Sequence, residues 1–167
     1  MIMAVDGHGV IGLENAQPWR ADAHQRLVRE ITYRSPVILG RNTWEAVVEQ
    51  AAAVDKPVLA QRVPIILSTT LDNATHEEIV AATPEQALDA AAGLGGVAYI
   101  LGGASTFEVF SPWADMVHLT RIPGCFPGDT FMERRWLAGF ELVDWALADD
   151  ESVEFETFVR TRGDGHA

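Results

Sequence analysis

Two glycine-containing junctions in this sequence bring together residue types that suit phosphate binding. An apolar, β-prone run over Pro36–Leu39 ends at Gly40, and Arg41 follows directly. The stretch Val97–Thr106 repeats this pattern, with an apolar run that leads through two glycines into a helical segment. Free backbone N–H groups and the positive end of a helix dipole meet at such a junction, so each is a candidate anion site. Two such sites on one small domain indicate a ligand with more than one phosphate, such as a dinucleotide.

The helix after the first junction has its own start signal. Asn42, with Glu45 three residues later, has the pattern of a capping box and predicts Asn42 as the N-cap. Strand–glycine–helix turns are also common as plain packing elements of α/β proteins. Neither junction carries the GxGxxG or GxxxxGK[ST] pattern, which argues against an ordinary Rossmann or P-loop site there. The order of motifs along the chain is therefore more informative than either junction.

Short motifs follow one another in an order that is more specific than any one of them. From the N-terminus they are Val10–Trp19, Val28–Thr32, Gly40–Glu45, Arg62 before Ile65–Thr69, Ile100–Gly103, Leu119–Thr120 and Gly128–Thr130. In this order and spacing the chain resembles dihydrofolate reductase over almost its full length. The resemblance implies one domain over residues 1–162 with a tail over 163–167. It also implies NADPH-dependent reduction of 7,8-dihydrofolate to tetrahydrofolate, by hydride transfer to the pterin.

The resemblance assigns the cofactor NADPH to the two junctions and the loop between them. Arg41 matches a residue that holds the cofactor phosphates, and Ser68 lies in the loop under the adenosine 2′-phosphate. Gly102 and Gly103 match a pair that the family joins by a cis peptide. Ser105 stands where the family often has a further basic residue. The implied cofactor contacts are Ala4, Ile11, Asn15, Ala16, Gly40, Arg41, Asn42, Thr43, Leu67, Ser68, Thr69, Gly102, Gly103, Ala104, Ser105 and Thr106.

The resemblance also implies a largely apolar substrate pocket closed by a mobile loop over Ile11–Trp19. This segment lacks strong periodicity and contains Pro18, which by itself predicts a loop. Arg62 matches the arginine that binds the α-carboxylate of the folate glutamate tail, and a solvated surface arginine is the alternative. The implied substrate contacts, several of which would serve equally as plain core residues, are Ile2, Met3, Ala4, His24, Val28, Val47, Leu59, Arg62, Leu101, Phe107 and Thr120.

The predicted first helix departs from the family at the pterin. The family has a carboxylate there, and a gapless alignment places His24 at that position. His24 shares a helix face with Val28 and Ile31, whereas Asp22 lies roughly 160° away around the helix. Asp22 also has the pattern of an N-cap, with Gln25 at the third helical position. The sequence therefore favours His24 and keeps Asp22 as the alternative acid, if the alignment slips.

A histidine at this position changes the chemistry that the site offers. A neutral imidazole provides one acceptor where a carboxylate provides two oxygens, so it contacts one of the two pterin donors. The implied catalytic residues are His24, Trp19 and Thr120, with Thr120 supporting the first from a neighbouring strand. Two alternatives stay open: a reductase of the same fold that acts on another pterin or a pyrimidine-like heterocycle, and a weakly active paralogue that binds nucleotide or pterin.

Composition and charge narrow the class of protein. A chain of 167 residues with 48% hydrophobic residues is long enough for one domain with a continuous core. We expect a cytoplasmic monomer that acts on a small molecule, because the sequence lacks a transmembrane run or leader. The net charge of −12, with Lys56 as the one lysine, disfavours nucleic acid and anionic membranes as partners. Cys125 has no candidate metal partners nearby, so we expect no metal site.

Alternating apolar strands and amphipathic helices predict an α/β fold: a mixed, mainly parallel sheet with a C-terminal antiparallel hairpin, flanked by about four helices. The predicted strands are Ile2–Val5, Pro36–Leu39, Val63–Leu67, Ala98–Leu101, Val117–Ile122, Glu141–Ala146 and Glu154–Arg160. The predicted helices are Ala23–Thr32, Thr43–Ala51, Pro84–Ala92 and Ser105–Phe110. This pattern gives seven strands, whereas the resemblance implies a sheet of eight.

Overall fold

The computed structural model describes residues 1–71 and 77–161, which contain ten strands, four α-helices and one 3₁₀ helix. The strands are β1 (Ile2–Val5), β2 (Val10–Gly12), β3 (Pro36–Gly40), β4 (Val63–Leu67), β5 (Ile79–Ala81), β6 (Tyr99–Gly102), β7 (Met116–Arg121), β8 (Thr130–Phe131), β9 (Phe140–Leu147) and β10 (Glu154–Arg160). The helices are α1 (Asp22–Ile31), α2 (Arg41–Ala53), α3 (Pro84–Leu94) and α4 (Ala104–Phe110), with the 3₁₀ helix at Arg134–Leu137.

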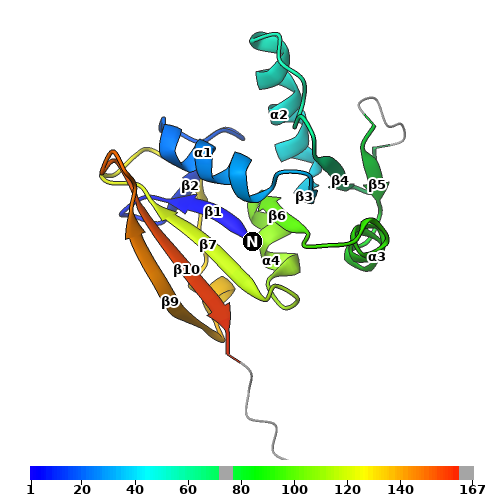
Figure 1. The fold of residues 1–167 in the computed structure, drawn as a ribbon. Coiled ribbons are helices and arrows are strands. Elements are labelled where there is room, and N and C mark those ends of the chain that lie inside the picture. Colours follow the sequence, from blue (N-terminus) through cyan, green and yellow to red (C-terminus); the bar gives the residue numbers. More distant parts are fainter. Residues whose placement is uncertain (72–76, 162–167) are drawn as a thin grey trace, which may run out of the picture.

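Two four-stranded sheets form the framework (Figure 1). One has the order β5-β4-β3-β6 and is entirely parallel, and the other has the order β1-β7-β10-β9. In the second sheet β1 and β7 are parallel, and β10 pairs antiparallel with both β7 and β9. Strands β6 and β1 lie next to each other, so the eight strands continue across the molecule. The predicted mixed sheet and its C-terminal antiparallel hairpin are confirmed.

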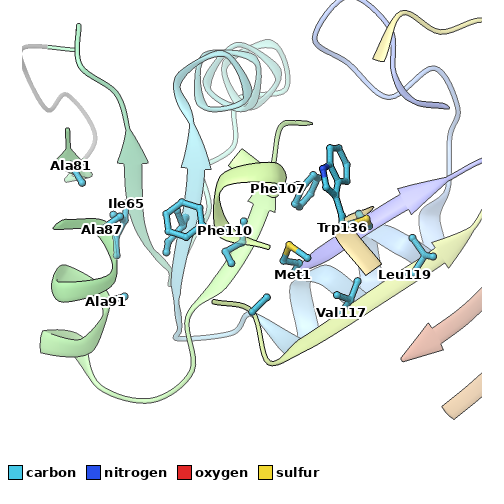
Figure 2. Close-up of a cluster of buried hydrophobic side chains, with 14 of the residues drawn as sticks. Met1, Ile65, Ala81, Ala87, Ala91, Phe107, Phe110, Val117, Leu119 and Trp136 are labelled. Carbon is cyan, nitrogen blue, oxygen red and sulfur yellow. The ribbon is translucent and has the colours of Figure 1, made fainter. Parts of the chain in front are cut away.

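The side chains of β3 point alternately to the two faces of the parallel sheet, and helices pack on both faces. Val37 and Leu39 of β3 pack with Trp44 of α2, whereas Ile38 between them belongs to the cluster that includes α3 and α4. Successive side chains of a strand point to opposite faces, which explains the division. Figure 2 shows the cluster that contains Ile38 and residues of α3 and α4. In it Phe107 lies beside Trp136, with ring centroids 5.8 Å apart.

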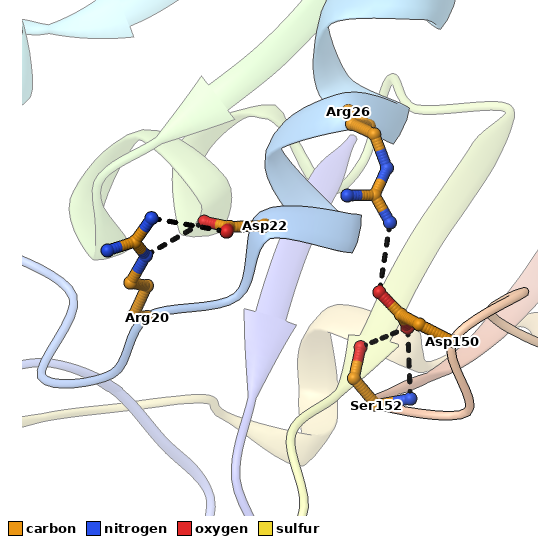
Figure 3. Close-up of polar contacts among 5 residues, drawn as sticks. All are labelled: Arg20, Asp22, Arg26, Asp150 and Ser152. Carbon is orange, nitrogen blue, oxygen red and sulfur yellow. Dashed lines mark hydrogen bonds and ion pairs between the residues drawn. The ribbon is translucent and has the colours of Figure 1, made fainter.

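A third apolar cluster fastens α1 to the other sheet. Its buried members include Ala4 of β1, Trp19 before the helix and Ala23 within it. The outer face of α1 is joined to the β9–β10 turn by an ion pair between Arg26 and Asp150, 3.0 Å long (Figure 3). The helix therefore lies against the second sheet, with one side facing β1 and β7. Among the described residues, no helix combines the length and hydropathy needed to cross a membrane.

Both predicted helix caps are wrong. Helix α2 begins at Arg41 with Gly40 as its N-cap, so Asn42 lies within the helix. The acid of the predicted box, Glu45, is 2.7 Å from the Nε of Arg41 and forms an ion pair along the helix. Helix α1 begins at Asp22 after Ala21, with no side-chain cap, because Asp22 turns to Arg20 instead (Figure 3).

The sequence pattern missed the shortest elements. Strands β2, β5 and β8 have two or three residues each, which is too few for a period of two to be visible. All seven predicted strands and all four predicted helices are present, with boundaries that differ by at most two residues. β5 completes the outer edge of the parallel sheet, and β2 pairs with β8.

Candidate active site

A cleft of about 960 Å³ lies between α1 and the two glycine junctions. Most of the residues predicted from the sequence lie on its wall. Those are Ile2, Met3, Ala4, Ile11, Asn15, Ala16, Trp19, His24, Val28, Gly40, Arg41, Asn42, Thr43, Val47, Leu59, Leu67, Leu101, Gly103, Ala104, Ser105, Thr106 and Phe107. Five predicted residues, and the alternative acid Asp22, are not part of the wall; the five are Arg62, Ser68, Thr69, Gly102 and Thr120.

The two glycine junctions meet at one end of this cleft. β3 pairs with β6, which places the start of α2 beside the start of α4. A Cβ atom added at Gly40 would lie 2.5 Å from Thr106 Oγ1, and one at Gly103 would lie 3.0 Å from Thr43 Oγ1. Only glycine fits such a close approach of two chain segments without displacing a neighbour. The Gly102–Gly103 peptide bond is cis, as the resemblance implies.

Arg41 stands at the edge of this end, next to the loop after β4. Its Nε is 2.7 Å from Glu45 Oε1, and its Nη1 donates to Thr70 Oγ1 at 2.7 Å. Ser68 Oγ accepts from the backbone N–H groups of Thr70 and Leu71, which shapes the loop. A guanidinium has five N–H donors, so Arg41 keeps three for a ligand. The arrangement can hold a phosphate near Arg41 and the β4 loop.

His24 lies at the other end, buried at 4% exposure. Its Nδ1 is 2.8 Å from the Oγ1 of Thr120, which is itself fully buried in β7. Burial lowers the pKa of His24 to about 4, so the ring is neutral at neutral pH. Because Nδ1 bonds to Thr120, Nε2 of His24 remains for a ligand. If Nδ1 carries the proton, Nε2 accepts a hydrogen bond, and if Nδ1 accepts from Thr120, Nε2 donates one.

Asp22 occupies a different environment from His24. Its side chain is 60% exposed and pairs with Arg20, whose Nε is 3.1 Å from Asp22 Oδ1 (Figure 3). Asp22 is not part of the cleft wall. The hydrogen bond with Arg20 lowers the pKa of Asp22, so it is an ordinary ionised surface carboxylate. Of the two candidates, the structure therefore brings His24 alone to the cleft.

Trp19 joins the loop to the cleft wall. The indole is buried and packs edge-on against Phe126, with ring centroids 5.5 Å apart. Its Nε1 is buried and finds no hydrogen-bond acceptor within the described part of the chain. The loop is also fixed at Glu14, whose backbone N–H donates to Asp129 at 2.9 Å. The packing against Phe126 and the Glu14 contact together hold the loop and its indole in the cleft wall.

Arg62 is held by three hydrogen bonds of 2.7 Å outside the wall. Its Nε donates to Thr32 Oγ1, its Nη1 to the Ala60 carbonyl and its Nη2 to the Arg29 carbonyl. Burial and, second, the nearby Arg29 charge lower the pKa of Arg62. Two N–H donors remain, one on each terminal nitrogen, and that pair suits both oxygens of a carboxylate. The anchoring orients Arg62 more firmly than an ordinary surface arginine.

Several residues of the wall were missed by sequence reasoning. They are Gly12, Gln17, Gln25, Leu39, Ala46, Gln50, Val109 and Thr130. For α2 a signal existed, because Ala46 and Gln50 share one helix face with Thr43 and Val47 at spacings of three and four residues. Gln25 Nε2 donates to Gln17 Oε1 at 3.4 Å. This contact between helix and loop could not be predicted from any local sequence pattern.

Comparisons with known proteins agree on one family. The family model "Dihydrofolate reductase" matches residues 1–161. The dihydrofolate reductase of Lactococcus lactis is 28% identical, and the alignment covers 95% of this chain and 92% of that protein. Dihydrofolate reductase 1 of Haloarcula marismortui is 25% identical, with 92% and 94% covered. A solved structure of dihydrofolate reductase from Enterococcus faecalis, complexed with NADP(H) and RAB-propyl, superposes with a TM-score of 0.82 at 28% identity, covering 96% of this chain and 95% of that chain.

Proposed function

The chain belongs to the dihydrofolate reductase family, and on this basis we propose that it reduces 7,8-dihydrofolate to tetrahydrofolate with NADPH. The observation that carries the proposal is one cleft with a glycine-built cradle at one end and a buried polar pair, His24 and Thr120, at the other. We further propose that the protein acts as a cytoplasmic monomer on this small molecule.

The residues at the glycine end fit NADPH. The cradle at Gly40 and Gly103 admits no side chain, which leaves backbone N–H groups to face the phosphates. Arg41, with three donors free, lies beside Ser68 and Thr70 and suits the 2′-phosphate. When bound, the cofactor supplies a hydride from its nicotinamide ring. The protein contributes position and the exclusion of water from the cleft.

At the other end the chain's own residues orient the substrate. His24 Nε2 contacts one polar group of the pterin ring, while Val28, Val47 and Leu101 provide apolar walls. Arg62 binds the tail carboxylate with its two remaining donors. Trp19 closes this end, and water admitted past its loop delivers the proton to the pterin. His24 does not supply that proton, because its ring is neutral at neutral pH.

The proposal is tested by following the loss of NADPH absorbance with purified protein and 7,8-dihydrofolate, against a control without substrate. We expect turnover with dihydrofolate and a lower rate with NADH in place of NADPH. A second candidate, suggested by the single ring contact of His24, is reduction of another pterin or a pyrimidine-like heterocycle. Faster turnover of a tail-free dihydropterin than of dihydrofolate would favour that candidate, since Arg62 would then have no role.

The role of His24 is tested by restoring the family's acid. His24→Asp places a carboxylate beside Thr120 that accepts from both pterin donors, so we expect faster dihydrofolate turnover and tighter binding of protonated diaminopyrimidines. His24→Asn is the matched control, since it keeps a polar group of similar size without the charge. Equal turnover of wild type and both variants would remove His24 from the substrate site.

A further inference from the structure

Asp6 is a buried charge that the proposed reaction does not use. It follows β1 and is 3% exposed. Its Oδ1 accepts from the backbone N–H groups of His8 at 2.8 Å and Val10 at 2.9 Å. Its Oδ2 accepts from the backbone N–H of Phe126 at 2.8 Å. Burial by itself raises the pKa of Asp6, but these N–H groups and the His8 charge outweigh it, so the pKa falls below its usual value.

The third of these bonds joins two distant parts of the chain. Phe126 lies in the loop between β7 and β8, 120 positions after Asp6. Only one other backbone bond ties that loop to the β1–β2 turn within the described residues: Gly7 N–H donates to the Gly124 carbonyl at 3.1 Å. The Asp6 carboxylate therefore adds a charge-assisted contact to the backbone of Phe126, whose ring packs in the cluster around Trp19.

The loop that Asp6 holds supports the cleft wall in turn. The Phe126 ring meets Trp19 edge-on, with an interplanar angle of 68°. Further along the same loop, Asp129 accepts from Glu14 N–H and donates its own N–H to the Gly12 carbonyl at 3.1 Å. The segment between Gly12 and Trp19 is thus supported at both ends by the β7–β8 loop, and Asp6 acts on the Trp19 end.

We propose that Asp6 is a positioning residue: by holding the Phe126 N–H, its carboxylate keeps the Phe126 ring against Trp19 and so keeps Trp19 in the cleft wall. Displacement of the Phe126 backbone withdraws the ring that supports the indole. Trp19 then no longer closes that end of the cleft, so a substrate there is positioned less precisely and hydride transfer to it is slower. This consequence for catalysis rests on the proposed function, whereas the effect on the Gly12–Trp19 segment does not.

The test compares Asp6→Asn, Phe126→Leu and the double variant with wild type. Asp6→Asn keeps the size of the side chain but removes the charge and turns an amide NH₂ toward backbone N–H groups. We expect kcat to fall about tenfold in either single variant, and the double variant to be little worse, because both changes act through Trp19. Affinity for 2′,5′-ADP, which occupies only the glycine end, should be unchanged.

Asp144→Asn is the matched control. Asp144 also accepts one backbone N–H, from Trp145, but it is exposed on β9 away from the cleft. We expect wild-type kinetics from this variant. Unchanged kcat and KM in folded Asp6→Asn, with only a lower melting temperature, would overturn the proposal and leave Asp6 a plain stabilising residue. If Asp6→Asn does not fold, Phe126→Leu carries the same kinetic test.

Hydrogen exchange separates this proposal from the proposed function. We expect faster backbone exchange over Gly12–Trp19 in Asp6→Asn and Phe126→Leu than in wild type, and no such change in Asp144→Asn. This readout requires no turnover, so it holds even if dihydrofolate is not the substrate. Wild-type exchange over this segment in both variants would overturn the positioning role directly.

Discussion

The two ends of the cleft are built from different parts of the polypeptide. The end that we propose for the cofactor is built from backbone at Gly40 and Gly103, where two strands lead into two helices. The proposed pterin end is built from a few buried side chains, above all His24 against Thr120. A backbone site persists as long as the fold does, whereas a side-chain site changes with a single replacement. On this contrast, a replacement at the His24 position can alter the pterin end while the fold and the glycine end are kept.

A side chain at Gly40 should therefore have the largest effect of any change that we predict. A Cβ there lies 2.5 Å from Thr106 Oγ1, and Thr106 is buried, so neither group has room to move. We expect Gly40→Ala to weaken the binding of NADPH by about 3 kcal/mol, which raises its Kd more than a hundredfold. A fluorescence titration with NADPH measures the loss.

Two further variants sharpen that prediction. Gly40→Ala combined with Thr106→Ala removes the obstructing oxygen and should recover part of the affinity. Gly93→Ala adds the same methyl group within α3, where no atom lies within 4 Å of the new Cβ, and should slightly raise the melting temperature. Wild-type NADPH affinity in Gly40→Ala would mean that the cofactor does not approach this junction.

The pterin end should carry a pH dependence of stability that the backbone end lacks. Burial lowers the pKa of His24 from 6.5 to about 4, so between these values the unfolded chain binds a proton that the folded chain refuses. The stability is complete above pH 6.5 and falls as the pH drops toward 4, by up to about 3 kcal/mol. Urea unfolding at several pH values should show a steeper loss for wild type than for His24→Asn. Identical slopes would assign the acid sensitivity to other groups.

The same contrast determines what the sequence reveals. The glycine junctions and the alternation of β3 are local patterns, so the longer strands, the four helices and the glycine end of the cleft follow from the sequence. The choice of His24 over Asp22 rests on the gapless alignment to the family and on the helix face that His24 shares with Val28 and Ile31. The caps at Asn42 and Asp22 were wrong because arginines nearby, Arg41 and Arg20, compete for the same acids. The Asp6–Phe126 contact joins residues 120 positions apart and has no local signal.

Arg41 is an exception within the cofactor end, since it acts through its side chain. If it binds the 2′-phosphate, Arg41→Ala should weaken the binding of NADPH by about 2 kcal/mol. The binding of NADH, which has no such phosphate, should be nearly unchanged. Steady-state KM values for the two cofactors give the comparison. Arg121→Ala, which removes an arginine paired with Glu156 away from the wall, is the control. An equal loss for NADPH and NADH would assign Arg41 to a phosphate that both share.

Arg62, which we propose binds the substrate tail, allows a test of whether a binding side chain depends on the residues that orient it. Arg62→Leu should raise KM for dihydrofolate about tenfold with little change in kcat, as expected for a contact made equally in ground and transition states. Thr32→Val removes the acceptor of Arg62 Nε, together with the bond that the hydroxyl donates to the Val28 carbonyl, and should raise KM less. An unchanged KM in Arg62→Leu would remove the arginine from the site.

Replacing Asp22 should have the smallest effect of the changes that we predict, and it tests whether His24 or Asp22 contacts the pterin. An exposed ion pair such as Asp22–Arg20 contributes little to stability, because solvent screens both charges. Asp22 also neither caps α1 nor reaches the cleft wall. Asp22→Ala should therefore leave the melting temperature and kcat/KM of the wild type unchanged, in the assay where His24→Asn changes kcat/KM. The opposite pattern, loss of turnover in Asp22→Ala with a silent His24→Asn, would show that α1 rotates on ligand binding and that the acid is Asp22 after all.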